Sequence, residues 1–528
     1  MKKRLLTMIA VMCAVCTQVR AAQKAQTTKP RLVVGIMVDQ MRWDYLERYC
    51  DRYCDGGFRR MMDEGYNCTR CMINYIPAVT AVGHTSVYTG SVPAFHGITN
   101  NGFYVDGKNT SAPYDERMKT VGSDTKAGER SPHNLMATTM GDELRMATNF
   151  RSKVIGVAIK DRASILPAGH AANAAYWLDD TDDRFITSSY YMQQLPQWVV
   201  DFNKYNKSKE YMKRNWPRKM MYPEDTYVQS HPRDERIEHE VGRDIRTTPW
   251  GATLTLDMAR AAIEGEELGK DDFTDMLCVS ISSTDAIAHR VGCNSQYIED
   301  AMLWLDHDLE QFFTFLDEKV GKGQWTAFLT ADHAGSHNLQ WRMDHKIPAQ
   351  VWESTEVVKS LNQKIADETG VSEKLVKEIS SFKVRLDEAV IKERGLDRNR
   401  VADIVIGHLK TLPTVLHAYD VERIPDYIPE PLRTMTRNGF YPGRTGQIQI
   451  IPVNGVMEAF SYGEGQNLKG ANHALWGPDD THIPLVFLGC GVPKGEDNHT
   501  VHITDIAATI CSLLRIQEPS ACVGEAIF

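Results

Sequence analysis

Residues Arg31 to Val38 read RLVVGIMV, an apolar run that ends directly on Asp39. A continuous run of this kind is typical of a strand that is buried on both faces of a parallel sheet. Similar runs recur along the chain, and each is followed by a stretch with helical periodicity. The further predicted strands are Lys153 to Ile159, Met276 to Ile281, Trp325 to Thr330 and Pro484 to Leu488.

Helical patterns lie between these strands, at Asn134 to Asn149, Ala252 to Glu267, Ser295 to Val320 and Thr504 to Leu514. Alternating strands and helices predict an α/β fold, with a mostly parallel central sheet flanked by helices. Two stretches, at about 181–249 and 351–459, break the alternation. The first is aromatic and charged without a clean period, and the second joins a charged helical part to a Gly-punctuated alternation typical of hairpins. We expect both to be cap insertions in one domain spanning 22–528.

The N-terminus has the pattern of a secretory signal peptide over residues 1–21. Lys2, Lys3 and Arg4 precede an apolar run from Leu5 to Cys16, and small residues follow at Ala21. That run is too short for the roughly 20 residues that span a bilayer, and no later stretch qualifies as a transmembrane segment. We therefore expect an exported protein, periplasmic or secreted. Lipid attachment at Cys13 or Cys16 is a weaker alternative, because no small residue precedes either cysteine.

Composition and charge exclude several classes of protein. With 42% hydrophobic and 24% charged residues, the chain is neither disordered nor fibrous. Its formal net charge of −9 disfavours nucleic acid binding, so an anionic substrate needs a local cationic site. Nine of the 11 cysteines follow the signal segment, and Cys50, Cys54, Cys68 and Cys71 have spacings that would suit zinc. Export favours disulfides over zinc, with the pairing left open.

Ligands of open α/β sheets bind at the carboxyl ends of the strands, and metal-binding residue types gather there in this sequence. An aspartate or histidine alone at such a position is more often a helix cap or a hydrogen-bonded residue. Six of them at four strand ends favour a pair of divalent cations, for which zinc suits both residue types. The six are Asp39, Asp285, His289, Asp332, His333 and His482. The further histidines His84, His96, His337 and His473 are candidates for supporting roles only.

Three more residues suit a nucleophile and a site for a tetrahedral oxyanion. Thr80 stands just before a predicted helix, where it would be a simple N-cap, or a nucleophile if a metal lowers the pKa of its hydroxyl. Lys160 and Arg162 follow the second strand and could both face a tetrahedral oxyanion. Taken alone, a Lys-x-Arg pair is more often solvated surface.

Five ordered motifs resemble the alkaline phosphatase superfamily, and within it the phosphate-irrepressible, PafA-type bacterial alkaline phosphatases. They are the TAVGHTSVYTG run from Thr80, the KDR at 160–162, the STDAIAH at 283–289, the ADHAG at 331–335 and the THIP at 481–484. The resemblance implies that Asp39, Asp332 and His333 hold one zinc, to which Thr80 also binds. It implies that Asp285, His289 and His482 hold a second zinc, and that no magnesium is needed.

The same resemblance implies a function. Thr80 would form a phosphothreonine intermediate, Asn101 would bind a phosphoryl oxygen, and Lys160 with Arg162 would favour small phosphate monoesters. The expected protein is a two-zinc alkaline phosphatase, with a monomer favoured. Residues 79–83 lack the Cys or Ser that sulfatases mature to formylglycine, which disfavours sulfate hydrolysis. The rival hypotheses are a nucleotide pyrophosphatase/phosphodiesterase-like diesterase and a silent zinc-holding ectodomain.

Overall fold

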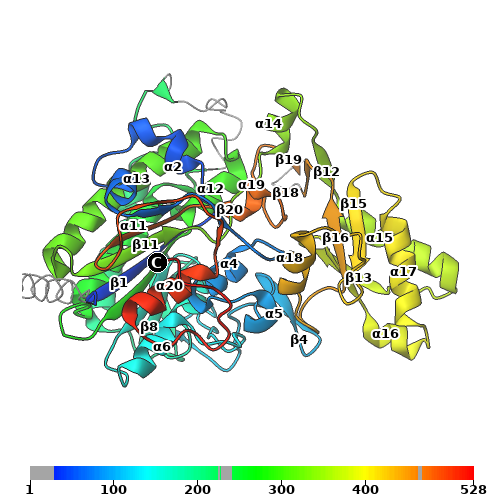
Figure 1. Cartoon of the computed structure of the whole chain (residues 1–528), viewed down its shortest axis with the longest axis horizontal. Coiled ribbons are helices and arrows are strands. Elements are labelled where there is room, and N and C mark those ends of the chain that lie inside the picture. Colours follow the sequence, from blue (N-terminus) through cyan, green and yellow to red (C-terminus); the bar gives the residue numbers. More distant parts are fainter. Residues whose placement is uncertain (1–28, 224–225, 228–240, 459, 462–465) are drawn as a thin grey trace, which may run out of the picture.

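The computed structural model describes residues 29–223, 226–227, 241–458, 460–461 and 466–528. The predicted signal peptide lies outside these described residues. A ten-stranded sheet forms the centre of the fold (Figure 1), with strand order β22-β2-β21-β11-β1-β10-β7-β8-β9-β6. The five central strands β11 (Trp325–Thr330), β1 (Leu32–Val38), β10 (Asp275–Ile281), β7 (Val154–Ala158) and β8 (Ala174–Asp179) are parallel. This arrangement confirms the predicted fold class.

The outer strands complete the sheet with both orientations. β21 (Leu485–Gly489) pairs antiparallel with β11, and β9 (Arg184–Ser188) pairs antiparallel with β8. The remaining outer strands are β2 (Tyr66–Cys68), which pairs with β21, and the two edge strands β22 (Gly495–Asp497) and β6 (Thr120–Val121). The stretch 181–249 is expected to have no regular period, but it contains β9, which belongs to the central sheet. After β9 come the helices α8 (Gln197–Lys204) and α9 (Lys207–Met212) and the 3₁₀ turn η3 (Ile245–Thr247).

The register of the central strands explains where the site forms. All seven residues of β1 are buried, as expected for a strand covered on both faces. Val38 at the end of β1 pairs with Ile281 at the end of β10, and Met37 pairs with Thr330 at the end of β11. Parallel strands that end in register deliver the residues that follow them to one edge of the sheet.

Helices cover the sheet in two groups, which lie on opposite sides of it in Figure 1. α11 (Trp250–Gly265) packs on β10 and on α13 (Gln296–Leu316). In the other group, α4 (Thr80–Thr89) packs against α7 (Asp161–Ala168), α6 (Met140–Ala147) and α20 (Asp505–Leu514). Among the described residues, none of the helices combines the length and the apolar character that crossing a membrane would require.

Residues 350–458 form a lobe beside the central sheet, drawn mainly in yellow in Figure 1. Its antiparallel sheet has the order β13 (Val376–Ser380), β14 (Lys383–Leu386), β16 (Ile448–Pro452) and β15 (Val415–Asp420). The helices α15 (Ser354–Thr369) and α17 (Arg398–Leu409) pack on this sheet around an apolar core of its own.

The nine cysteines between Cys50 and Cys522 are all free thiols in the structure. The expected disulfides among Cys50, Cys54, Cys68 and Cys71 are therefore not present. Their spacing suited a cross-link, but the fold distributes them: Cys68 and Cys71 are buried in β2 and β3 (Cys71–Met72), whereas Cys54 lies in a turn against α13.

Candidate metal centre

Three buried carboxylates meet at the carboxyl edge of the central sheet. Asp39 directly follows β1, Asp332 follows β11 by one residue, and Asp285 lies in the first turn of α12 (Ser283–Val291), just after β10. The Nζ of Lys160, which follows β7, lies 2.5 Å from Asp39 Oδ2 and 2.7 Å from Asp285 Oδ2. Four neighbouring strand ends thus bring together four of the residues singled out in the sequence.

Two of the predicted histidines join these carboxylates. The Nε2 of His333 lies 3.5 Å from Asp39 Oδ1 and 3.5 Å from Asp332 Oδ2. The Nε2 of His289 lies 3.0 Å from Asp285 Oδ1. Asp285 and His289 are one turn apart on α12, so the helix itself holds them side by side.

The third predicted histidine, His482, does not lie beside these carboxylates. His473 lies beside them instead. The His482 ring donates to the carbonyl of Thr69 at 2.9 Å and stacks on Trp43. The His473 ring stacks on His333 with 3.6 Å between centroids, and its Nε2 lies 3.9 Å from Asp285 Oδ1. On this geometry we propose His473 as the third histidine in place of His482.

The physical reason is strand pairing. His482 begins β20 (His482–Ile483), whose pairing with β3 fixes the backbone of this residue beside Met72. His473 lies in an irregular segment that precedes α19 (Pro478–Thr481). A search of strand ends could not distinguish it from the other histidines, since no strand or helix marks its position in the sequence.

The three histidines share one orientation. Each Nδ1 donates to a backbone carbonyl: His289 to Ala471, His333 to Ala334 and His473 to Ala78, at 2.8 to 2.9 Å. This bond turns each Nε2 toward the carboxylates and fixes the tautomer that a metal requires. Burial lowers the pKa of His333. Burial also lowers the pKa of His473, and the neighbouring His333 and His289 lower it further. Both rings are therefore neutral at pH 7.

Unpartnered buried atoms show that these residues fit divalent cations. Asp39 Oδ1, Asp285 Oδ1, Asp332 Oδ2 and His333 Nε2 are buried without a hydrogen-bond partner. Buried acceptors without donors are costly, and a cation among them would remove that cost. Two groups have ligand atoms within 4.8 Å of one another: Asp39, Asp332 and His333, and Asp285, His333 and His473. Oxygen and imidazole donors of this kind suit zinc.

Electrostatics supports the same conclusion. Burial, and then the charges of Asp285 and Asp332, raises the pKa of Asp39 well above its usual range. Burial opposes the charge of Lys160, yet Asp285 and Asp39 raise the pKa of this lysine overall. One ammonium faces three buried carboxylates, so added cations would relieve the remaining repulsion.

Thr80 lies at the start of α4, beside the candidate group of Asp39, Asp332 and His333. The helix begins at Thr80 itself, with Val79 in the N-cap position, so the hydroxyl of Thr80 is not the predicted cap. Gly83 packs so tightly that a Cβ atom there would lie 2.1 Å from the Asp332 carbonyl oxygen. The Nδ1 of His84 lies 2.9 Å from the Thr80 carbonyl and 3.2 Å from Asp332 Oδ2. The N-terminus of α4 is thus fixed beside Asp332.

Asn101 and Arg162 complete the set of predicted residues. Asn101 Oδ1 accepts a hydrogen bond from the N–H of Ala81 at 2.9 Å, which places this amide beside Thr80. Arg162 is the second residue of α7, the helix that packs on α4, and its buried Nε has no hydrogen-bond partner. Its charge is close enough to Lys160 to affect the pKa of that lysine.

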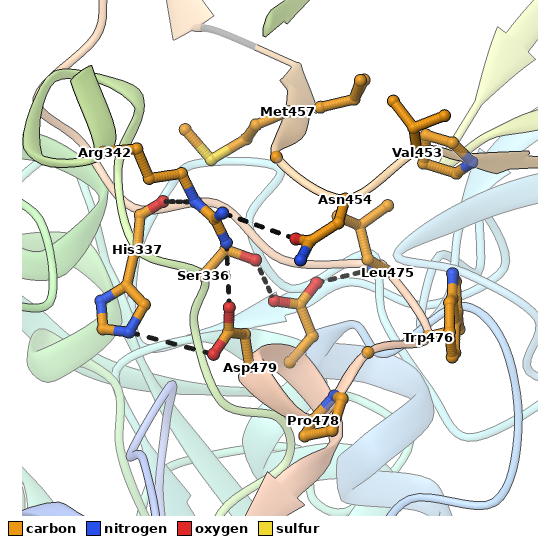
Figure 2. Close-up of a pocket in the computed structure, with 15 residues that line it drawn as sticks. Ser336, His337, Arg342, Val453, Asn454, Met457, Leu475, Trp476, Pro478 and Asp479 are labelled. Carbon is orange, nitrogen blue, oxygen red and sulfur yellow. Dashed lines mark hydrogen bonds and ion pairs between the residues drawn. The ribbon is translucent and has the colours of Figure 1, made fainter. Parts of the chain in front are cut away.

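A cavity of about 340 Å³ lies beyond the loop that carries His333, between that loop and the turn at Pro452 to Met457 (Figure 2). Arg342 pairs there with Asp479 at 3.1 Å, and the Nε2 of His337 lies 4.0 Å from Asp479 Oδ1. Among the described residues that line it, none is a candidate metal ligand. His337 therefore belongs to this cavity rather than to the metal groups.

The fold and site together define an α/β enzyme with candidate metal-binding groups at the carboxyl edge of a parallel sheet. The sequence profile of the type I phosphodiesterase / nucleotide pyrophosphatase family matches residues 33–476. The chain belongs to this family and to the alkaline phosphatase superfamily, which confirms the resemblance in the sequence motifs.

Three relatives cover nearly the whole chain. Alkaline phosphatase PafA of Elizabethkingia meningoseptica is 42% identical over 96% of this chain and 95% of its own. A protein named calcium-transporting ATPase from Myroides odoratus is 42% identical over 99% and 98%, and alkaline phosphatase PhoV of Synechococcus elongatus is 40% identical over 94% and 92%. The crystal structure of PafA superposes with a TM-score of 0.89, at 42% identity, over 94% of this chain and 98% of that one.

Proposed function

We propose that this protein is an exported alkaline phosphatase, which hydrolyses small phosphate monoesters with two bound Zn²⁺ ions and a phosphothreonine intermediate on Thr80. Two of the three relatives named above are alkaline phosphatases. The observation that carries the proposal is the position of Lys160, whose ammonium joins Asp39 of one candidate metal group to Asp285 of the other. A positive charge between two metal groups is placed to bind the phosphoryl group that both would share.

The proposed ligands are Asp39, Asp332 and His333 for one ion, with Thr80, and Asp285, His289 and His473 for the other. When bound, the ions would act as Lewis acids toward the attacking and leaving oxygens. The remaining steps are assigned to the chain itself. Thr80 Oγ loses its proton to solvent and attacks phosphorus, the ester P–O bond breaks, and the leaving alkoxide takes a proton from solvent to become the alcohol. Water then cleaves the phosphothreonine, which releases phosphate and restores the hydroxyl.

The residues around Thr80 bind the equatorial phosphoryl oxygens. The Ala81 N–H fixes Asn101 Oδ1, which leaves the Nδ2 end of this amide as its donor to a phosphoryl oxygen. The N-terminus of α4 adds the positive end of its dipole. Lys160 contributes an ammonium and Arg162 a planar guanidinium, charges that a dianionic monoester uses more fully than a monoanionic diester.

A diesterase is the second candidate, favoured by the name of the matching family. Initial rates on an aryl phosphate monoester and its matching diester separate the two functions. Wild type should prefer the monoester, and Lys160→Ala with Arg162→Ala should depress monoester hydrolysis far more than diester hydrolysis. Equal losses on both substrates, or a wild-type preference for the diester, would refute the monoesterase proposal.

Export to the periplasm or medium, and cleavage of residues 1–21, are part of the proposal. The mass of the mature protein recovered from the host periplasm tests it. The expected mass is that of a chain that begins near Ala22. A full-length protein retained in the cytoplasm would contradict export.

A further inference from the structure

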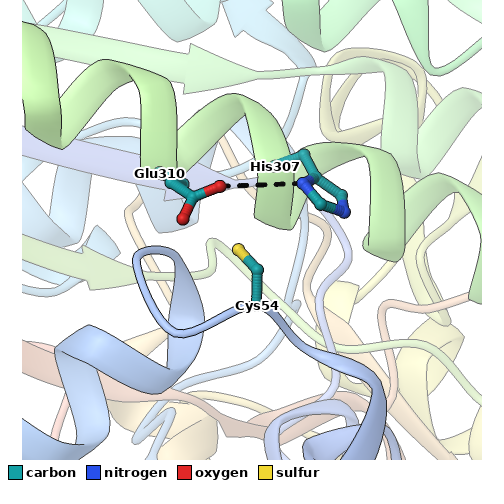
Figure 3. A group of neighbouring side chains, drawn as sticks. All are labelled: Cys54, His307 and Glu310. Carbon is teal, nitrogen blue, oxygen red and sulfur yellow. Dashed lines mark ion pairs between the residues drawn. The ribbon is translucent and has the colours of Figure 1, made fainter.

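A second kind of metal-binding group lies outside the candidate catalytic centre. His307 and Glu310 lie on one face of α13, one turn apart, and Cys54 comes from the turn between the 3₁₀ helix η1 (Cys50–Arg52) and α3 (Phe58–Glu64). Figure 3 shows the Sγ of Cys54 pointing from its turn toward α13, between the other two side chains. The three ligand atoms lie within 4.8 Å of one another, and His307 Nδ1 is 3.7 Å from Glu310 Oε2.

The turn that carries Cys54 is held in place before any ligand binds. Asp306, the neighbour of His307, accepts hydrogen bonds from the N–H of Cys54 at 2.6 Å and from that of Phe58 at 2.7 Å. Gly56 packs so closely on Glu310 that a Cβ there would lie 2.5 Å from the Glu310 Cγ. The turn that carries Cys54 and the Glu310 side chain are therefore supported by contacts of their own, and binding would not have to order the turn.

We propose that Cys54, His307 and Glu310 bind one Zn²⁺ ion, separate from the candidate catalytic centre. Sulfur, imidazole and carboxylate donors together suit zinc better than magnesium or calcium, which prefer oxygen alone. The side chains of His307 and Glu310 are 39% and 41% exposed, so the ion enters from solvent and water completes its coordination. The ion would tie α13 to the segment that follows β1.

Binding exchanges a proton for the metal. Burial, and then the hydrogen bond and charge of Asp306, raises the pKa of the Cys54 thiol to about 12, so this side chain is protonated at pH 7 without a cation. An S–Zn bond forms, the S–H bond breaks and the proton goes to solvent, with no change in oxidation state. The negative charges of Asp306 and Glu310 that oppose the thiolate also attract a dication.

Metal analysis of the purified full-length protein tests the proposal. After dialysis in metal-free buffer, wild type should hold one more equivalent of zinc per chain than Cys54→Ser and than His307→Gln. Cys50→Ser, a cysteine in the same segment, is the matched control and should keep the wild-type zinc content. Equal zinc in wild type and in both folded variants would overturn the proposal.

A spectroscopic test is independent of the catalytic metals. The candidate catalytic groups contain no sulfur donor, so a thiolate-to-cobalt charge-transfer absorption in the Co²⁺-substituted protein reports the Cys54 group alone. The absorption should be present in wild type, Cys50→Ser and His473→Ala, and absent in Cys54→Ser. Its absence from wild type, or its persistence in Cys54→Ser, would refute the proposal whatever the outcome for the phosphatase activity.

Discussion

The carboxyl edge of the central sheet and the lobe of residues 350–458 contribute to the site in different ways. The sheet edge gathers Asp39, Lys160, Asp285 and Asp332, because parallel strands end in register there. The lobe has a separate apolar core, and its described residues include none of the candidate metal ligands. Instead it contacts the segments on either side of α4, the helix that begins with Thr80.

These contacts are specific hydrogen bonds rather than general packing. Lys383 of β14 is buried and donates to the carbonyls of Ile76 and Gly439, both at 2.8 Å. Asn100, the neighbour of Asn101, donates to the hydroxyl of Ser381 at 3.0 Å. The comparison teaches that the sheet supplies Lys160 and the buried carboxylates of the candidate metal groups, whereas the lobe helps to fix where Thr80 and Asn101 lie.

The largest expected effect comes from Thr80→Ala, at the sheet edge. Losing the nucleophile should reduce monoesterase kcat by at least about a thousandfold. The metal content should stay at the wild-type level, since the Asp and His donors remain. Rates and metal analysis on the same preparation check this. Undiminished turnover would exclude Thr80 as the nucleophile, and a wild type without turnover would favour the silent ectodomain.

The next effect distinguishes two histidines. His473→Ala should lose about one metal equivalent and reduce activity by about a hundredfold or more. Even the loss of a residue that only hydrogen-bonds to a metal ligand typically reduces metal affinity or activity by about 10- to 100-fold. His482→Ala is the matched control and should keep both metals and most of the activity, since this ring contacts Thr69 and Trp43. The reverse pattern would restore the ligand set expected from the sequence.

Lys383→Met tests the connection between the lobe and α4. It should lower the free energy of unfolding by about 1–3 kcal/mol, since two buried carbonyls lose their donor. It should also reduce kcat several-fold, with the metal content unchanged. A loss of stability alone, with full activity, would show that the lobe does not position Thr80.

The same variant has a predicted pH dependence. Burial lowers the pKa of Lys383 to about 7, well below the roughly 10.4 of an unfolded lysine. Between these values the unfolded chain binds more protons, so this group's contribution to stability rises with pH and is lost as pH falls toward 7. The Tm advantage of wild type over Lys383→Met should therefore grow between pH 7 and pH 10. An advantage independent of pH would contradict the lowered pKa.

The smallest effect is expected on the outer surface of the lobe. Lys359 and Glu356 form an ion pair there with both side chains 67% exposed. Lys359→Ala should change the free energy of unfolding by less than about 0.5 kcal/mol and leave kcat unaltered. Chemical denaturation and steady-state rates provide the check. A catalytic defect comparable to that of Lys383→Met would mean that the lobe affects activity without specific contacts.

The sequence predicted β1, β7, β10, β11 and β21 to within one residue at each end, because each is a continuous apolar run, but it missed the central strand β8. The strand-end rule then led to Asp39, Asp285 and Asp332, which the structure brings together. It did not select His473, which lies in an irregular segment, and it selected His482, whose ring contacts Thr69 and Trp43. It also missed β9, since a strand near the edge of the sheet, following a charged turn, lacks the long apolar run of the central strands.

The amino-acid sequence by itself determined the parallel sheet, the residue types at its carboxyl edge and the motifs that place the chain in its superfamily. Those features are local, because periodicity and neighbouring residues encode them. Only the tertiary structure decided that His473 faces Asp285, that Lys383 reaches Ile76, and that Cys54 meets His307 and Glu310. Each of these contacts joins residues far apart in the chain, and their distances depend on how whole elements pack rather than on any local pattern.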